Sequence, residues 1–140
     1  MKAGFWICVT ALCGCRPDAP APSQRFDLEC SGDLVTQRRP GLIPTKETLI
    51  IFYKVDEAAR RITIREGNRA WRNACEGKCE INFTDRGIKL NEEQQRDNYV
   101  ATTNMTWDRS AGTLFTETAL KDGQDVFQRA SFKGACKQSR

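Results

Sequence analysis

Hydrophobic and polar residues alternate along most of the chain from residue 26 onward. In "FDLECSGDLV" the apolar positions Phe26, Leu28 and Cys30 are each followed by a polar residue, and "TLIIFYKV" at 48–55 and "RITIRE" at 61–66 are rich in β-branched side chains. A period of two residues with β-branched content is typical of half-buried strands. The intervening "RRPGLIPTKE" contains two prolines and a glycine, which predict a break. We therefore expect one strand followed by a hairpin.

The second half of the chain continues this alternation. Residues 81–91 form the clearest predicted hairpin, because Gly87 can supply a positive φ in its turn. The segments 99–107 and 113–120 flank a polar turn, and 121–124 turns again into 125–136. Short connections place sequence neighbours side by side. The chain is therefore predicted to be mainly β, an antiparallel meander of about seven or eight strands that forms a small barrel or a sandwich.

One segment suits a helix better than a strand. Between two glycines, residues 68–75 place Ala70, Trp71, Ala74 and Cys75 at helical spacing, which predicts one or two helical turns. The strand alternation at Trp107, Phe115 and Phe127 predicts that these aromatic side chains lie in the core.

The first residues of the 140-residue chain have the pattern of an export signal. Lys2 precedes a mostly apolar run from Ala3 to Gly14, which is too short to span a bilayer but suits the apolar part of a secretory signal. A buried core helix is the alternative. "APA" at 19–21 fits a small-x-small cleavage site, although Pro22 would then follow the cut.

Leu12-Cys13-Gly14-Cys15 resembles the bacterial lipobox, in which a lipid is attached to the final cysteine. The resemblance implies a signal peptide at 1–14 and makes Cys15 the first residue of the mature protein. Residues 15–25, rich in proline and alanine, then form a flexible tether, and 26–140 form a single β domain. A diacylglyceryl group on Cys15 would hold the protein on a membrane surface.

Four of the seven cysteines remain after Cys8, Cys13 and Cys15 are assigned to the signal and the anchor. We favour disulfides between Cys30 and Cys136 and between Cys75 and Cys79. Pairing of Cys30 with Cys75 and of Cys79 with Cys136 is the main alternative. Structural zinc on these four thiolates is disfavoured by their spacing and by the oxidising conditions that export implies.

Composition excludes several kinds of activity. The chain has no histidine, so it contains neither a Ser-His-Asp nor a Cys-His arrangement. No phosphate-binding loop, metal cluster or nucleophile elbow occurs in the sequence. The 22 basic and 18 acidic residues give a net charge of +4 without the dense clustering that nucleic-acid binding needs. We therefore expect a protein that is not an enzyme, has no cofactor or metal, and does not bind nucleic acid.

The strongest local charge bias lies between residues 60 and 78. It marks a candidate contact patch for an envelope protein, an acidic glycan or an anionic lipid. A solvated face without a partner is the alternative. The six cations of this segment are Arg60, Arg61, Arg65, Arg69, Arg72 and Lys78.

The motifs "FDLECSG", "CEGKC" and "FKGAC" resemble a pattern of small exported bacterial proteins to which no activity is assigned. A more distant similarity is to the membrane-bound inhibitors of c-type lysozyme, which are lipoproteins built as small disulfide-tied antiparallel barrels. "RSAGTLF" has the serine and glycine of their inhibitory loop but not its tyrosine. These resemblances imply a lipid-anchored protein of the bacterial cell envelope, facing the periplasm or the exterior. It would serve as a binding or structural accessory module, or alternatively inhibit a wall-degrading enzyme such as lysozyme.

Overall fold

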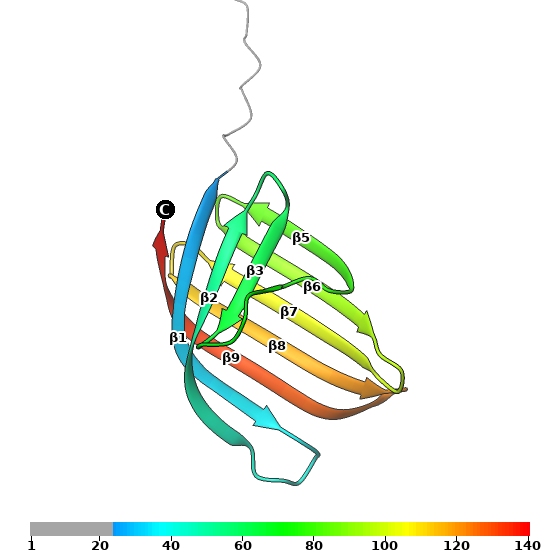
Figure 1. Cartoon of the computed structure of the whole chain (residues 1–140). Coiled ribbons are helices and arrows are strands. Elements are labelled where there is room, and N and C mark those ends of the chain that lie inside the picture. Colours follow the sequence, from blue (N-terminus) through cyan, green and yellow to red (C-terminus); the bar gives the residue numbers. More distant parts are fainter. Residues whose placement is uncertain (1–23) are drawn as a thin grey trace, which may run out of the picture.

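Nine strands pair into one antiparallel sheet in the computed structural model, which describes residues 24–140 (Figure 1). The predicted signal peptide, Cys15 and most of the predicted tether lie outside the described residues. The strands are β1 (Arg25–Gln37), β2 (Thr45–Asp56), β3 (Arg61–Glu66), β4 (Arg72–Asn73), β5 (Lys78–Thr84), β6 (Gly87–Gln95), β7 (Val100–Asp108), β8 (Thr113–Asp122) and β9 (Asp125–Ser139).

The order of strands across the sheet is β4-β3-β2-β1-β9-β8-β7-β6-β5. Each strand pairs with its neighbour in the chain except at the β4 to β5 step, and the first strand pairs with the last. The prediction of a mainly β antiparallel meander is therefore confirmed.

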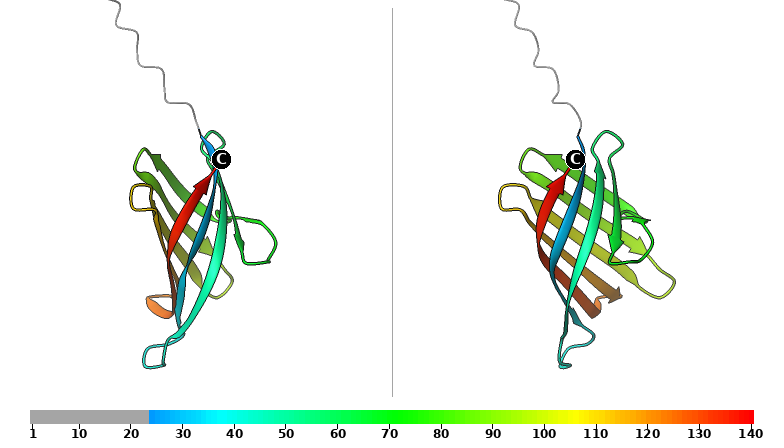
Figure 2. Two further views of the ribbon diagram at one scale, coloured as in Figure 1. Left: turned by 90° about the vertical axis from the view of Figure 1, so that its left-hand side faces the viewer. Right: turned by 60° about the vertical axis from the view of Figure 1, so that its left-hand side comes forward.

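The sheet curls on itself into a half-barrel (Figure 2). Among residues 24–140 its two edges, β4 and β5, share no ladder of hydrogen bonds, so the barrel stays open along this line. The curvature expected for a small barrel is present, and the two-sheet sandwich is not.

The predicted helix at 68–75 is wrong, because no helix occurs in the described part of the chain. Arg72 and Asn73 instead pair with β3 as the short strand β4, and the backbone N–H of Ala74 donates to the carbonyl of Ile62. Pairing with a neighbouring strand outweighs a weak helical preference here. This two-residue strand raises the count from the expected seven or eight to nine.

Both disulfides of the favoured pairing are present. Cys30 on β1 lies directly opposite Cys136 on β9, and their bond ties the first strand to the last. The second bond joins Cys75 to Cys79 between the two open edges. No helix within residues 24–140 is long and apolar enough to cross a bilayer.

The hydrophobic core fills one end of the half-barrel. Its central residues come from the first half of β1, the last half of β2 and the strand ends next to the β5–β6 and β7–β8 turns. Trp107 is buried there as predicted, whereas Phe115 points outward with 46% of its surface exposed, so its predicted place in the core is wrong. Fully or nearly buried members are Phe26, Leu28, Cys30, Tyr53, Val55, Ile62, Ile88, Leu90, Trp107, Leu114 and Phe132.

Two arginines link turns and strands that are not paired with each other at this end. Arg109, in the β7–β8 turn, lies over the rings of Phe26 and Trp107 and forms a 3.6 Å ion pair with Glu57 in the β2–β3 turn. Arg60 donates to the carbonyl of Ile81 on β5. The filled end is therefore held together by side chains where the strands do not pair.

Candidate functional site

The inward-facing side chains become small or polar toward the other end of the half-barrel. On β7 the inward series runs from Trp107 through Met105 to Thr103, and on β8 it runs from Leu114 to Thr118. Successive inward positions are two residues apart, so these threonines stand where a filled barrel would place large apolar side chains. The interior is therefore incompletely filled at this end.

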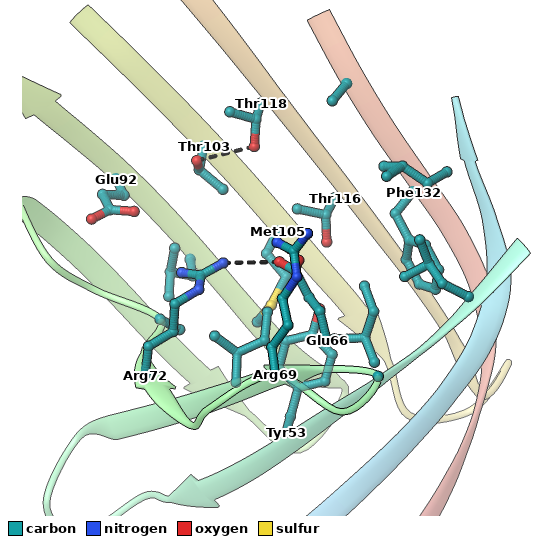
Figure 3. Close-up of a pocket in the computed structure, with 18 of the residues that line it drawn as sticks. Tyr53, Glu66, Arg69, Arg72, Glu92, Thr103, Met105, Thr116, Thr118 and Phe132 are labelled. Carbon is teal, nitrogen blue, oxygen red and sulfur yellow. Dashed lines mark hydrogen bonds and ion pairs between the residues drawn. The ribbon is translucent and has the colours of Figure 1, made fainter. Parts of the chain in front are cut away.

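The resulting cavity has a volume of about 450 Å³ (Figure 3). This volume lies within the range of pockets that hold small molecules. Its lining comes from β1, β2, β3, β4, β6, β7, β8 and β9, so almost the whole sheet contributes to it.

The floor of the cavity is apolar. Ile51, Leu90, Met105 and Phe132 are buried core residues that also line the cavity. Tyr53 lies beside them, and burial raises the pKa of its phenol above the ordinary tyrosine value. The deepest part of the cavity is therefore uncharged at neutral pH.

Threonine hydroxyls line one wall. The Oγ1 atoms of Thr103 and Thr118 share a 3.2 Å hydrogen bond. Thr116 lies near the Tyr53 phenol, yet its buried Oγ1 makes no hydrogen bond of acceptable geometry with the described residues. The Tyr53 phenol is a polar neighbour of this hydroxyl, so Thr116 can bond either with the phenol or with a polar group of a ligand.

Two arginines and a glutamate stand at the mouth of the cavity (Figure 3). Arg72 Nη2 lies 3.0 Å from Glu66 Oε1, and Arg69 Nη1 lies 3.5 Å from Glu66 Oε2. The two guanidinium groups share a single carboxylate, so this trio alone has one positive charge in excess. Glu47 and Glu92 also line the cavity, so its lining as a whole has three carboxylates against two guanidinium groups. Arg69 and Arg72 are both exposed to solvent, so each can change its ion-pair partner at low cost.

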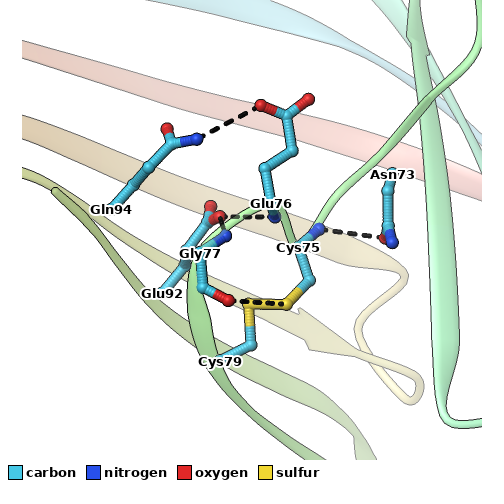
Figure 4. The surroundings of a disulfide bond; sticks show 7 residues. All are labelled: Asn73, Cys75, Glu76, Gly77, Cys79, Glu92 and Gln94. Atoms are coloured by element: carbon cyan, nitrogen blue, oxygen red, sulfur yellow. Dashed lines mark hydrogen bonds between the residues drawn. A yellow bond between two sulfur atoms is a disulfide. The ribbon is translucent and has the colours of Figure 1, made fainter. Parts of the chain in front are cut away.

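The side of the cavity at Glu92 is held in place by the small disulfide loop (Figure 4). Glu92 Oε1, which lines the cavity from β6, accepts hydrogen bonds from the backbone N–H groups of Glu76 at 2.7 Å and Gly77 at 2.8 Å. The Cys75–Cys79 bond closes the same loop. Together these contacts hold the segment that spans the two open edges of the sheet.

The six cations of the predicted contact patch lie in several places. Arg69 and Arg72 meet at the cavity mouth, and Arg60 binds β5 at the filled end. Arg61 and Lys78 are exposed at the first residues of β3 and β5.

Arg65 lies on the convex face of the sheet, in a stack of cations and aromatic rings. Its guanidinium lies 4.5 Å from the centre of the Phe52 ring and 5.0 Å from that of Trp71, and Lys54 Nζ lies 4.7 Å from the same Trp71 ring. Trp71 therefore binds neighbouring cations instead of the core, although 39% of its surface stays exposed.

The segment that resembles the inhibitory loop of lysozyme inhibitors is the β7–β8 turn. Asp108 Oδ1 accepts hydrogen bonds from the Ser110 N–H and hydroxyl and from the Ala111 N–H. These bonds hold the pKa of Asp108 below its usual value. The Ser110 hydroxyl is thus bound within its own turn.

No protein-family model matches this chain, and no curated protein matches it. Among residues 24–140, no three His, Cys, Asp or Glu side chains are grouped as ligands of a metal ion would be. The candidate site is therefore the cavity, which has a volume of about 450 Å³, an apolar floor and charged residues at its mouth.

Sequence reasoning missed the cavity although a signal for it was present. The hairpin predicted from the sequence ends at residue 91, before Glu92, but β6 continues through Gln95. The signal is the replacement of large apolar side chains by Thr103, Thr118 and Ala130 at positions that keep the inward phase of their strands. This signal can be recognised only when the register between strands is known, because the register shows that these small side chains lie next to one another.

Proposed function

We propose that this protein is a non-enzymatic binding module that holds one small amphipathic molecule inside the half-barrel. The observation that carries the proposal is the cavity of about 450 Å³, whose floor is apolar and whose mouth carries the Glu66, Arg69 and Arg72 trio. Apolar pockets with a few placed polar groups are the usual form of small-molecule sites.

The lining defines the chemistry of the ligand. An acyl chain or an apolar ring system would contact Ile51, Leu90, Met105 and Phe132 on the floor. An anionic group at the other end of the ligand would replace Glu66 as the partner of Arg69 and Arg72 at the mouth, where guanidinium groups can bind carboxylate or phosphate in a bidentate manner. A hydroxyl or carbonyl between the two ends could bond with Thr116 Oγ1.

The same lining gives little support for catalysis. Tyr53 is its one phenol, and burial raises the pKa of that phenol, which opposes its use as a base. Glu92 is already engaged by two backbone N–H groups, and Glu66 by two arginines. The polar groups of the cavity are therefore arranged to hold a ligand, and none is arranged to activate a nucleophile.

The proposed place of action is the bacterial cell envelope, with the protein held on a membrane by a lipid on Cys15. The lipobox resemblance supports this place, and two disulfides suit an oxidising compartment. An intact mass of the protein isolated from membranes tests it. Acylation at Cys15 is expected, and an unmodified chain that begins elsewhere would contradict it.

A dye titration tests ligand binding. The probe is 1-anilinonaphthalene-8-sulfonate, which combines apolar rings with an anionic group and fluoresces in apolar surroundings. Ala130→Phe should fill the cavity and weaken binding at least tenfold, because Ala130 points into it. Ala135→Phe is the matched control on the same strand, since Ala135 is exposed and does not line the cavity. Equal affinity of the two variants would overturn the proposal, as would a wild-type protein that does not bind the dye.

A further inference from the structure

The loop between β1 and β2, residues 38–44, exposes two neighbouring apolar side chains at its tip. Ile43 is 92% exposed and Leu42 is 56% exposed, the highest values among the large hydrophobic residues that the structure describes. Both Phe115 and Ile50 lie within strands and are less exposed. Adjacent apolar side chains that project into solvent from a loop indicate an interaction site.

Cations stand next to this apolar tip. Arg38 and Arg39 precede it in the loop, separated from Leu42 by two residues, and no ion pair is found for either within residues 24–140. Lys46 follows it and is paired with Asp33 at 2.9 Å. The loop therefore presents two free positive charges beside two apolar side chains.

The backbone of the loop is constrained. Pro40 and Pro44 fix two φ angles, Gly41 has φ of 90°, and the N–H of Leu42 donates to the carbonyl of Arg39 at 3.4 Å. Arg39 itself has φ of 135°, a conformation that side-chain-bearing residues rarely adopt. A preset loop loses less conformational entropy when its tip enters an ordered interface.

We propose that this loop docks the protein on an anionic lipid bilayer. Leu42 and Ile43 enter the boundary between headgroups and acyl chains, and Arg38 and Arg39 lie against the lipid phosphates. A bilayer fits this tip better than a protein partner does. A stable protein interface needs about 800 Å² on each side, whereas a membrane accepts two projecting side chains without a complementary pocket.

The loop lies next to the open end of the half-barrel (Figures 1 and 2). Leu34 on β1 and Glu47 on β2 line the cavity. Leu34 is four residues before the first loop residue, and Glu47 is three residues after the last one. At ~3.3 Å per residue, this separation corresponds to about 10 to 13 Å. A docked loop would therefore bring the side of the cavity lined by Leu34 and Glu47 near the lipid surface.

Docking by the loop requires neither the acyl group nor a cavity ligand. The described chain enters β1 at Arg25, and β1 spans 13 residues before the loop begins. At ~3.3 Å per residue, about 43 Å of chain along the curved strand separates the loop from the predicted anchor end. Membrane binding by a chain without lipid is therefore a separate property from ligand binding and from acylation.

The experiment is co-sedimentation of residues 15–140 carrying Cys15→Ala with lipid vesicles. One set contains phosphatidylcholine alone, and the other contains about 30% phosphatidylglycerol, a fraction chosen to give an anionic surface. The protein should bind the anionic vesicles at least tenfold more strongly. Leu42→Ser with Ile43→Ser should reduce that binding on the order of tenfold, and Arg38→Gln with Arg39→Gln should remove the preference for anionic lipid.

Phe115→Ser is the matched control, because Phe115 is the most exposed large hydrophobic residue outside the loop. It should leave vesicle binding unchanged. The proposal would be overturned if the unsubstituted chain bound neither vesicle. It would also be overturned if the Leu42 and Ile43 substitutions had no more effect than the Phe115 control. Because these side chains are exposed, matching circular dichroism and thermal midpoints are expected for all variants.

Discussion

Cys30 on β1 and Cys136 on β9 are direct partners across the sheet, and their disulfide joins strands that stand at opposite ends of the chain. In the sheet these two strands lie side by side near the centre, with β2, β3 and β4 beyond β1 and with β8, β7, β6 and β5 beyond β9. The bond therefore fastens the two halves of the half-barrel to each other at their common seam.

The two disulfides should differ in their effect on stability. Cys30 and Cys136 are 106 residues apart in sequence, whereas Cys75 and Cys79 are four apart. In the chain-entropy model, the long link stabilises by about 5 kcal/mol and the short one by about 2 kcal/mol. Urea unfolding of the Cys30→Ala, Cys136→Ala double variant should therefore show the larger loss of unfolding free energy. A larger loss of unfolding free energy in the Cys75→Ser, Cys79→Ser variant would contradict the prediction that the Cys30–Cys136 bond stabilises the fold more.

Glu92 should control the order of the small disulfide loop. Its Oε1 accepts the N–H groups of Glu76 and Gly77, so Glu92→Leu would leave both without this acceptor. Hydrogen exchange at these two amides should then accelerate at least tenfold, since hydrogen bonds to charged groups contribute about 1.5–3 kcal/mol. Glu92→Gln keeps an acceptor oxygen in the same place and should preserve most of the protection. Equal exchange in both variants would show that the disulfide alone orders the loop.

Tyr53 should make stability fall at high pH. Burial raises the pKa of its phenol in the folded state, so above pH ~10 the unfolded chain loses this proton while the folded chain keeps it. The folded state then binds more protons, and the free energy of unfolding decreases as pH rises, by about 1.4 kcal/mol per pH unit at most. Tyr53→Phe should flatten this decrease in urea unfolding between pH 8.5 and 11. Tyr99→Phe is the control, and an identical slope in the two variants would count against the buried phenol.

Arg69 and Arg72 should select for the charge of a ligand. Both guanidinium groups share Glu66, and replacement of the two by glutamine would turn the positive trio at the cavity mouth into a negative site. Affinity for dodecanoate should fall on the order of tenfold, while affinity for the neutral dodecanol should change little. Calorimetric titration checks this, with the exposed Arg61→Gln as control. An equal loss for both probes would assign the arginines a structural role instead.

Local sequence patterns predicted most of the fold. Alternation located eight strands because each buries one face. The favoured pairing, a small loop from Cys75 to Cys79 and a link between the first and last segments, is the one that the structure contains. Phe115 shows the limit of this approach. It lies in a strand as expected, but on the outward phase, which only the burial of Leu114 beside it reveals.

The cavity and the segment 68–75 depend on contacts that are distant in sequence. Arg72 and Asn73 become a strand because β3 offers hydrogen-bond partners, and Trp71 is held by Lys54 and Arg65 from two other strands. The cavity arises where small inward side chains of separate strands coincide. No single segment carries that information, since each strand taken alone has an ordinary alternation.

Met105 offers the most direct test that the half-barrel holds a ligand. It lies on the cavity floor and is the only methionine of the chain besides Met1. With ¹³C-methyl methionine labelling of residues 15–140 behind an added initiator methionine, the Met105 methyl resonance can be followed by nuclear magnetic resonance during a titration with dodecanoate. We expect a saturable shift of this resonance that Ala130→Phe abolishes and Ala135→Phe retains. A Met105 resonance that stays in place through the titration would contradict binding inside the half-barrel.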